Sequence, residues 1–284
     1  MTGWENYFTQ WAGSYDYKDK NVVKLPDNLP MPPTTNMSGM FCGCKELQDI
    51  SALANWDTSN VTNMRETFYN CKRLKDITAL SNWDTSNVTC MYETFRECKQ
   101  LEDISALANW NVSKVENIKG MFWSCKELKN ISALAKWNIS NMTYIGCIFY
   151  DCQQLRDISA LANWDTSKVN NMNYMFYDCE ELEDITPLSN WDTSTVTCMC
   201  GMFRDCVRLQ DVSALSNWDT SKVTDMYHMF NGCRYLKDFS ALVNWDISNI
   251  KYIDGYSDSM LIALSSIQSY ILQHQKKMNK FIID

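Results

Sequence analysis

Glycine, proline and histidine are scarce in this 284-residue chain, which holds nine, five and two of them. The sequence shows no glycine-rich phosphate-binding loop. The only histidines are His228 and His274, and Cys233 follows His228 at a spacing that does not suit a catalytic pair on one helical face. We therefore expect no enzymatic site, and we expect Asn, Asp and Ser to make the turns because their side chains bond nearby backbone groups.

An excess of basic residues and a long apolar run are also missing. The formal charge is −8 and the isoelectric point is near 4.9, which argues against nucleic acid or an anionic membrane as the partner. The longest apolar stretch, near Met260 to Leu264, is far too short to span a bilayer. No charged start precedes an apolar run, so no signal peptide is predicted, and an intracellular protein or a trimmed form is expected.

Four residue types instead recur with a constant step of 27 residues and no insertion. The tryptophan register comprises Trp56, Trp83, Trp110, Trp137, Trp164, Trp191, Trp218 and Trp245. The phenylalanine register runs from Phe41 to Phe230, the cysteine register from Cys44 to Cys233, and the leucine register from Leu47 to Leu236. A unit this short cannot bury its own apolar face, so neighbouring units must stack and share one core.

The repeats divide the chain into three parts. Residues 1–28 lack the pattern and are predicted to be an N-terminal cap, while residues 29–253 form about eight repeat units. Residues 254–284 carry apolar side chains at helical spacing and are predicted to be a capping amphipathic helix. Both ends are interpreted as caps because terminal units must cover the open core.

Within one unit, the sequence predicts a short helix and a short strand. Val88, Met91, Phe95 and Cys98 are spaced three, four and three residues apart, like one face of a helix that Ser86 would cap. LEDIS and the β-branched residue of WDTS suit short strands, although DISAL is also compatible with a 3-10 turn. Packed helices need about 8–10 Å and stacked strands about 4.8 Å. The predicted fold is therefore a curved α/β repeat solenoid with strands inside, helices outside and a cap at each end.

Thirteen cysteines are present, and eight of them belong to the repeating register. A cysteine at every step of an apolar face is interpreted as a small buried hydrophobe. The odd total argues against a disulfide framework, and the free cysteines favour an intracellular or virion setting. The others lack metal-ligand spacing, so no metal site is predicted: they are Cys42, Cys90, Cys147, Cys198 and Cys200.

Two columns of Asp, one from Asp49 to Asp238 and one from Asp57 to Asp246, have two interpretations. Stacked carboxylates suit calcium, but each Asp could also accept a backbone N–H bond at a turn, a role in which Asn substitutes naturally. The tryptophan column likewise suits either a sugar-stacking ladder or the core. We favour turns for the Asp columns and the core for the tryptophans, and we predict no cofactor.

The repeated segments WDTSNVTNM at 56–64, WDTSNVTCM at 83–91 and WDTSKVTDM at 218–226 resemble the BspA-like leucine-rich-repeat family. The resemblance covers residues 29 to about 253. It implies a curved repeat solenoid and allows a place at a cell surface, because many family members are bacterial surface proteins in adhesion or host contact. Other members occur in protists and giant viruses. The chain has Trp where many members have Phe.

Function is expected where the copies differ, and one variable register directly follows the buried Phe. Tyr, Trp and Arg are common there, and these residue types dominate interface hot spots. With the register one turn earlier, it gives a candidate partner-binding stripe: Tyr69, Arg96, Trp123, Tyr150, Tyr177, Arg204, Arg65, Tyr92, Lys119 and Tyr227. The alternative interpretation is that these side chains merely fill gaps between repeats.

The sequence therefore predicts a non-enzymatic protein–protein interaction scaffold, with adhesion or virion–host contact as possible settings. A carbohydrate-binding module that uses exposed aromatic side chains is the first alternative. The second is a structural or assembly component that self-associates through its C-terminal segment.

Overall fold

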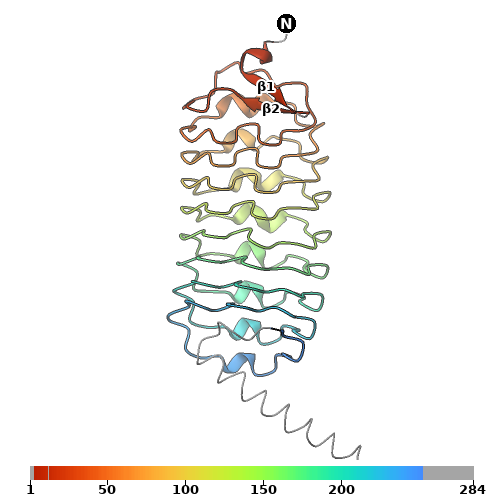
Figure 1. The fold of residues 1–284 in the computed structure, drawn as a ribbon, viewed down its shortest axis with the longest axis vertical. Coiled ribbons are helices and arrows are strands. Elements are labelled where there is room, and N and C mark those ends of the chain that lie inside the picture. Colours follow the sequence, from red (N-terminus) through yellow and green to blue (C-terminus); the bar gives the residue numbers. More distant parts are fainter. Residues whose placement is uncertain (1–2, 12, 252–284) are drawn as a thin grey trace, which may run out of the picture.

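The computed structural model describes residues 3–11 and 13–251. They form an elongated column of stacked rungs, one rung for each 27-residue unit (Figure 1). The prediction of a repeat solenoid is confirmed. The predicted C-terminal capping helix, residues 254–284, lies outside the described residues, and its role stays a prediction.

The N-terminal segment packs on the first rung. It holds η1 (Trp4–Asn6) and an antiparallel hairpin of β1 (Phe8–Trp11) and β2 (Ser14–Tyr17). The Phe8 ring lies 6.1 Å from the Phe41 ring and 6.2 Å from the Trp56 ring, so the hairpin continues the aromatic core. A parallel bridge joins Lys24 to Asp49, so pairing between rungs begins before the predicted boundary at residue 29.

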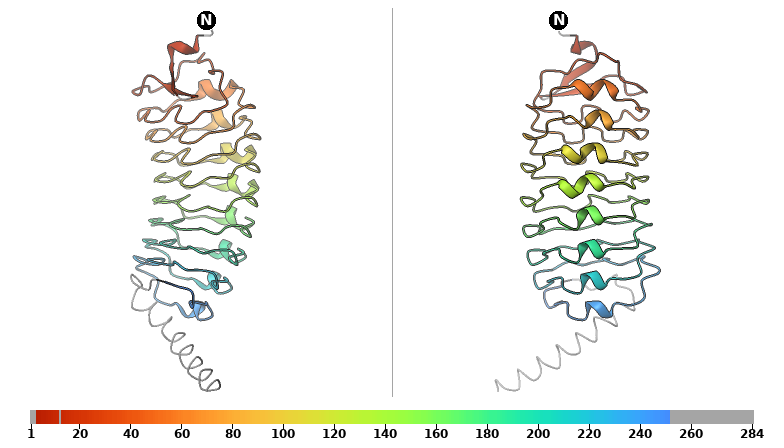
Figure 2. Two further views of the ribbon diagram at one scale, coloured as in Figure 1. Left: turned by 45° about the vertical axis from the view of Figure 1, so that its right-hand side comes forward. Right: turned by 180° about the vertical axis from the view of Figure 1, so that it is seen from behind.

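Each rung carries a short 3-10 turn, and these turns lie one above another along one side of the column (Figure 2). They are η2 (Ser51–Asn55), η3 (Thr78–Leu80), η4 (Ser105–Asn109), η5 (Ser132–Lys136), η6 (Ser159–Leu161), η7 (Thr186–Leu188), η8 (Ser213–Leu215) and η9 (Ser240–Leu242). The 3-10 alternative for DISAL is right. The strand over LEDIS is wrong, because the described part of this segment gives only isolated bridges such as Asp103 to Asn130.

The segment predicted as an α-helix, from Val88 to Cys98, is a series of tight turns. The Met91 N–H donates to the Asn117 carbonyl of the next rung, whereas the Thr94 N–H donates to the Met91 carbonyl three residues back. An α-helix would direct each N–H to the residue four back. The helix prediction is wrong because apolar residues at the inner corners of successive turns have the same spacing as a helical face.

The predicted helix cap at Ser86 and the strand at Thr85 are also wrong. The Ser86 backbone N–H donates to Asp84 Oδ1 at 2.9 Å, so the aspartate forms the turn and Ser86 supplies the donor. The Thr85 hydroxyl donates to the Asn111 carbonyl of the next rung at 3.1 Å. Both residues therefore serve turns and contacts between rungs.

Two positions in every rung adopt the left-handed backbone conformation, with φ between 52° and 80°. The first column is Gly39, Glu66, Glu93, Gly120, Cys147, Tyr174, Gly201 and His228. The second column is Gly43, Asn70, Glu97, Ser124, Asp151, Asp178, Asp205 and Gly232. Each left-handed residue breaks the helical path, and in most rungs its N–H donates to a carbonyl of the next rung, as from Glu66 to Tyr92 at 2.8 Å.

The eight tryptophans of the repeat form the spine of the core and are 1–7% exposed. Each indole N–H donates to a leucine carbonyl of the preceding unit at 2.9–3.2 Å. Neighbouring rings stack in five of the pairs, with centroids 6.2–6.5 Å apart. The prediction that this column belongs to the core is confirmed, and a sugar-stacking role for it is wrong.

The phenylalanine and cysteine columns line the rest of the core. The Phe rings stack at 5.4–6.0 Å. Seven cysteine thiols donate to the Phe carbonyl of the preceding rung at 3.0–3.2 Å. Burial raises the pKa of the Cys44 and Cys233 thiols to about 12, which keeps them protonated as donors. The prediction of a buried cysteine ladder is confirmed.

The predicted curvature depended on helices on one side and strands on the other. The described residues contain no α-helix. The Phe rings are 5.4–6.0 Å apart and the Trp rings 6.2–6.5 Å apart, so these two columns differ in spacing by about an ångström at most. The wedge that would force a helix-outside arc is missing, and that part of the prediction is wrong.

Candidate functional site

Six of the predicted interaction residues form one continuous ladder, with one side chain per rung. This aromatic ladder is Tyr69, Arg96, Trp123, Tyr150, Tyr177 and Arg204. The Arg96 guanidinium carbon lies 5.5 Å from the Tyr69 ring centre and 4.0 Å from the Trp123 ring centre. Trp123 and Tyr150 are 4.4 Å apart, Tyr150 and Tyr177 are 4.3 Å apart, and Arg204 lies 5.3 Å over Tyr177. All six side chains are half-buried.

The second predicted register is less continuous. Arg65 lies over the Tyr92 ring at 4.6 Å, and Lys119 lies 5.4 Å from the ring of Tyr144. Tyr227 is exposed, and its ring contacts His228 at 3.8 Å. The structure therefore brings Arg65, Tyr92 and Lys119 into cation–π pairs, while the ring contact of Tyr227 is to its own neighbour in the chain.

Two tyrosines of this surface were missed by the sequence prediction. The Tyr174 ring lies 6.3 Å from Tyr150 and 6.0 Å from Tyr177, and Cys200 Sγ lies 3.2 Å from the Tyr174 hydroxyl. The second is Tyr144, whose ring centre lies 5.4 Å from Lys119 Nζ in a cation–π contact. Neither tyrosine stands in a register with other aromatic residues, so no repeating aromatic pattern marked them.

The turns of the rung fix the place of the ladder. Each ladder residue lies between the two left-handed columns and directly after the buried Phe. The Tyr69 N–H bonds back to the Glu66 carbonyl at 3.0 Å, whereas Asn70 donates to the Arg96 carbonyl of the next rung at 2.7 Å. The hydrogen bonds between rungs therefore set the spacing at which ladder side chains meet.

The charge in the ladder is partly enclosed. Glu93 is 5% exposed and pairs with Arg96, whose Nη1 lies 2.8 Å from Glu93 Oε1. The Arg96 Nε is buried without a hydrogen-bond partner, and the guanidinium lies between two rings. Burial raises the pKa of Tyr150, and a hydrogen bond with Cys200 together with burial raises that of Tyr174. Their hydroxyls stay neutral near physiological pH.

Carboxylates of the second left-handed column run beside the ladder. Asp151 accepts the Ser124 hydroxyl at 2.7 Å and pairs with Lys126 at 3.1 Å. Burial, together with the neighbouring Asp151 carboxyl, raises the pKa of Asp178 to about 6, although Gln153 donates to Asp178 at 3.3 Å. This side of the ladder therefore changes its charge near pH 6.

Replacing Asp178 by Asn should stabilise the protein at pH 8 but not at pH 4. The pKa of Asp178 is about 6 in the folded chain and about 3.9 unfolded. Ionisation therefore costs stability above pH 6, and this cost vanishes below pH 4. Discounted for partial solvent exposure, we expect about 1 kcal/mol, or a melting temperature about 2–3 °C higher. Thermal unfolding at both pH values measures the change.

The matched control is Asp205→Asn, because Asp205 stands in the same column one rung further on and lies 3.3 Å from Arg204 Nε. Removal of that carboxylate leaves Arg204 without this ion pair, so no gain at pH 8 is expected. An Asp178→Asn effect of equal size at pH 4 and pH 8 would contradict the assignment of the raised pKa.

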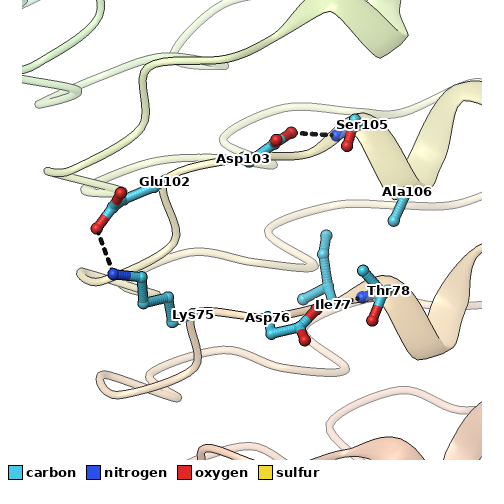
Figure 3. Close-up of a pocket in the computed structure, with 8 residues that line it drawn as sticks. All are labelled: Lys75, Asp76, Ile77, Thr78, Glu102, Asp103, Ser105 and Ala106. Carbon is cyan, nitrogen blue, oxygen red and sulfur yellow. Dashed lines mark hydrogen bonds and ion pairs between the residues drawn. The ribbon is translucent and has the colours of Figure 1, made fainter.

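The Asp columns form turns. Asp76 Oδ1 accepts the Thr78 N–H at 2.8 Å, and Asp103 Oδ1 accepts the Ser105 N–H at 2.6 Å (Figure 3). Asn130 makes the same bond in its rung at 3.0 Å. The turn interpretation is confirmed. Within residues 3–11 and 13–251, no three His, Cys, Asp or Glu side chains are grouped to hold a metal ion.

No helix of the described chain has the length and apolar character needed to cross a membrane. A comparison with curated proteins finds no match.

Three solved leucine-rich repeat structures are similar to this chain. One, from Eubacterium ventriosum, is 16% identical with a TM-score of 0.35, and the match covers 88% of this chain and 52% of that one. A leucine-rich cell surface protein from Faecalibacterium prausnitzii is 14% identical with a TM-score of 0.30 and coverages of 90% and 94%. A protein from Bacteroides ovatus is 14% identical with a TM-score of 0.16 and coverages of 81% and 91%. The chain thus spans about half the length of the first.

A family model also matches this chain. Residues 35–160 and 148–270 match the family described as "Mycoplasma protein of unknown function, DUF285". The three solved structures are leucine-rich repeat proteins by description, the class to which the BspA-like resemblance of the sequence refers. Because the two matched segments cover most of the sequence, the chain belongs to the DUF285 family.

Proposed function

We propose that this protein is a non-enzymatic scaffold that binds a protein partner through the aromatic ladder. The observation that carries the proposal is the stack of Trp, Tyr and Arg side chains that follows the outside of an otherwise repetitive core. The Phe beside each ladder residue is buried in every rung, whereas the ladder residue is half-buried and varies. Such residue types, already held in place, are those that dominate interface hot spots.

The ladder side chains can fill the space between rungs and also bind a partner. The Tyr150 and Tyr177 rings stack 4.3 Å apart with planes 9° from parallel, so each covers part of the other. The Phe column already fills the interior, and the ladder lies outside it. Stacking fixes the side chains before a partner arrives, which lowers the entropy lost on binding.

The same stacking argues against the carbohydrate alternative. A sugar ring stacks on the face of an aromatic side chain, but the faces of Trp123, Tyr150 and Tyr177 are directed at one another at 4.3–4.4 Å. The ladder offers ring edges and hydroxyls instead. Ring edges beside Arg and carboxylate groups suit a protein surface with its own polar and aromatic side chains.

The test is a pull-down with chemical cross-linking, which compares the wild-type chain with a double variant, Trp123→Ala with Tyr150→Ala. We expect the yield of the bound protein to fall about tenfold or more, because each change removes a hot-spot residue type. Tyr235→Ala is the matched control, since Tyr235 is 60% exposed but stands outside the ladder. Equal recovery of the same partner by the double variant would refute the proposed binding surface.

Adhesion at a cell surface is the setting that the family resemblance suggests, and it remains a proposal. The predicted self-association through residues 254–284 also stays a prediction, because that segment lies outside the described residues.

A further inference from the structure

The surface that carries the ladder has opposite charges on its two halves. One register on this surface reads Lys72, Lys99 and Lys126 in consecutive rungs and then continues as Gln153 and Glu180. The second left-handed column beside the ladder holds Asn70, Glu97 and Ser124 in the first half and Asp151, Asp178 and Asp205 in the second, so its negative charge is concentrated in the second half. The basic half belongs to a chain whose net charge is −8, so the division is not a consequence of overall composition.

Side-chain contacts show that these two columns share one face. Lys126 Nζ reaches Asp151 Oδ1 at 3.1 Å, one rung further along. Gln153 Nε2 lies 3.3 Å from both Asp178 Oδ2 and Glu180 Oε1. Among the described residues, Lys72 and Lys99 make no ion pair. The basic half of the face therefore has charges left to pair with a partner.

When two copies face each other in antiparallel orientation, the ladder residues of one copy lie opposite suitable residues of the other. A two-fold axis across the column, between the rungs of Trp123 and Tyr150, would bring Trp123 opposite Tyr150 of a second copy. The same rotation brings Arg96 opposite Tyr177 and Tyr69 opposite Arg204, so every ladder pair is aromatic or cation–π.

The same rotation also brings one pair of opposite charges together. Because the axis lies across the column, each register faces itself: Lys99 faces Glu180, whereas Lys126 faces Gln153 and Lys72 faces Val207. In the second left-handed column Asp178 faces Glu97, so Lys99 and Glu180 are the charge pair that favours this arrangement. Closed two-fold contacts use one patch twice and so require this kind of self-complementarity.

We infer that the ladder face binds the same face of a second copy of this chain, in an antiparallel arrangement with two-fold symmetry. The inference rests on the proposed function and names the partner of the same surface. Five steps from Phe68 to Phe203, each of 5.5–6.0 Å, make the face about 29 Å long. A standard interface buries about 800 Å² per partner, equal to a disc roughly 32 Å across.

Sedimentation equilibrium of the whole chain tests the pairing. The wild-type chain should form a dimer that weakens as salt rises, because charge pairs contribute to it. Lys99→Glu and Glu180→Lys should each weaken dimerisation by about tenfold or more. The double variant, Lys99→Glu with Glu180→Lys, should restore the affinity to within about threefold of the wild type, since both intermolecular pairs reform.

Recovery of the dimer affinity in the double variant would show that Lys99 and Glu180 contact each other between copies. Lys99 and Glu180 are three rungs apart, and the Phe rings of these rungs are separated by three steps of 5.8–6.0 Å. That distance, about 18 Å, excludes a direct ion pair within one chain. Thermal unfolding of each variant should match the wild type, because Lys99 and Glu180 lie outside the core.

Three results would overturn the inference: a wild-type monomer at every concentration, a dimer unaffected by either reversal, or single variants that the double variant does not rescue. The proposed function is tested separately. If the wild type is monomeric but Trp123→Ala with Tyr150→Ala still abolishes capture of another protein, the binding surface stands and only the identity of the partner is wrong.

Discussion

Trp164→Ala should lower the free energy of unfolding by about 4 kcal/mol. Trp164 is 4% exposed, stacks on Trp191 at 6.2 Å and donates its indole N–H to the Leu134 carbonyl at 3.0 Å. Truncation therefore leaves a large cavity and a buried carbonyl without its donor. Both effects are destabilising, and neighbouring rungs held by their own hydrogen bonds have little freedom to close the gap.

The loss should also divide the column. Repeat units contact mainly their neighbours, so stability is close to a sum of unit and interface contributions. A weakened central rung lets the two halves unfold separately, and urea unfolding followed by circular dichroism should become broader, with a smaller dependence on urea. The wild-type chain should unfold in a steeper transition.

Trp164→Phe is the matched control, because it keeps an aromatic ring and removes the indole N–H. We expect it to lose about 1–2 kcal/mol. If Trp164→Ala costs no more than Trp164→Phe, the indole column does not stabilise the stack in the way described.

The repeat and its core were readable from the sequence because burial is periodic here. A residue that must fit between identical neighbours above and below repeats at every step, so Trp, Phe, Cys and Leu marked the inside of the column. The turn role of the Asp columns was readable for a similar reason. Asn130 replaces Asp without loss of the bond, since both side chains present the same oxygen.

The local backbone conformation could not be predicted from the sequence. Glu66, Glu93 and Tyr174 adopt left-handed φ values that their residue types ordinarily avoid, at a cost of roughly 1–2 kcal/mol each. Hydrogen bonds to the next rung hold these conformations, and their partners lie 26 residues away, as from Glu66 to Tyr92. A prediction from local spacing finds a helix instead, because three-residue turns and a helix place apolar residues at similar intervals.

Part of the candidate site could be predicted from the sequence. The ladder register stood out because it varies beside an invariant Phe, and the structure brings its six residues into one stack. The tyrosines Tyr144 and Tyr174 occupy registers that hold other residue types in other rungs, so only the fold shows that they join this surface.

Gly201→Ala should destabilise the chain by about 3 kcal/mol, which is more than a glycine at a turn usually costs. Gly201 has φ of +57°, and an added Cβ would lie 2.4 Å from two ring carbons of Tyr174 in the preceding rung. Tyr174 cannot easily move aside, because its ring contacts Tyr150 and Tyr177 and its hydroxyl meets Cys200. The substitution therefore combines backbone strain with overpacking.

Gly39→Ala separates the two contributions. Gly39 stands in the same left-handed column with φ of +66°, but its added Cβ would meet only Cys42 Cβ at 3.8 Å. It should cost about 1–2 kcal/mol, the strain of the left-handed backbone alone. Urea unfolding of both variants gives the difference, which measures the steric part at Gly201.

A second substitution identifies the source of that difference. In the Tyr174→Ala background, Gly201→Ala should cost no more than Gly39→Ala costs in the wild type, because the ring that the Cβ would strike is gone. Such a coupling of about 1–2 kcal/mol is typical of residues in direct contact. If Gly201→Ala lowers the free energy of unfolding equally with and without the Tyr174 ring, this ring does not pack against Gly201. The ladder surface beside Tyr150 would then be less firmly ordered than the contacts of Tyr174 indicate.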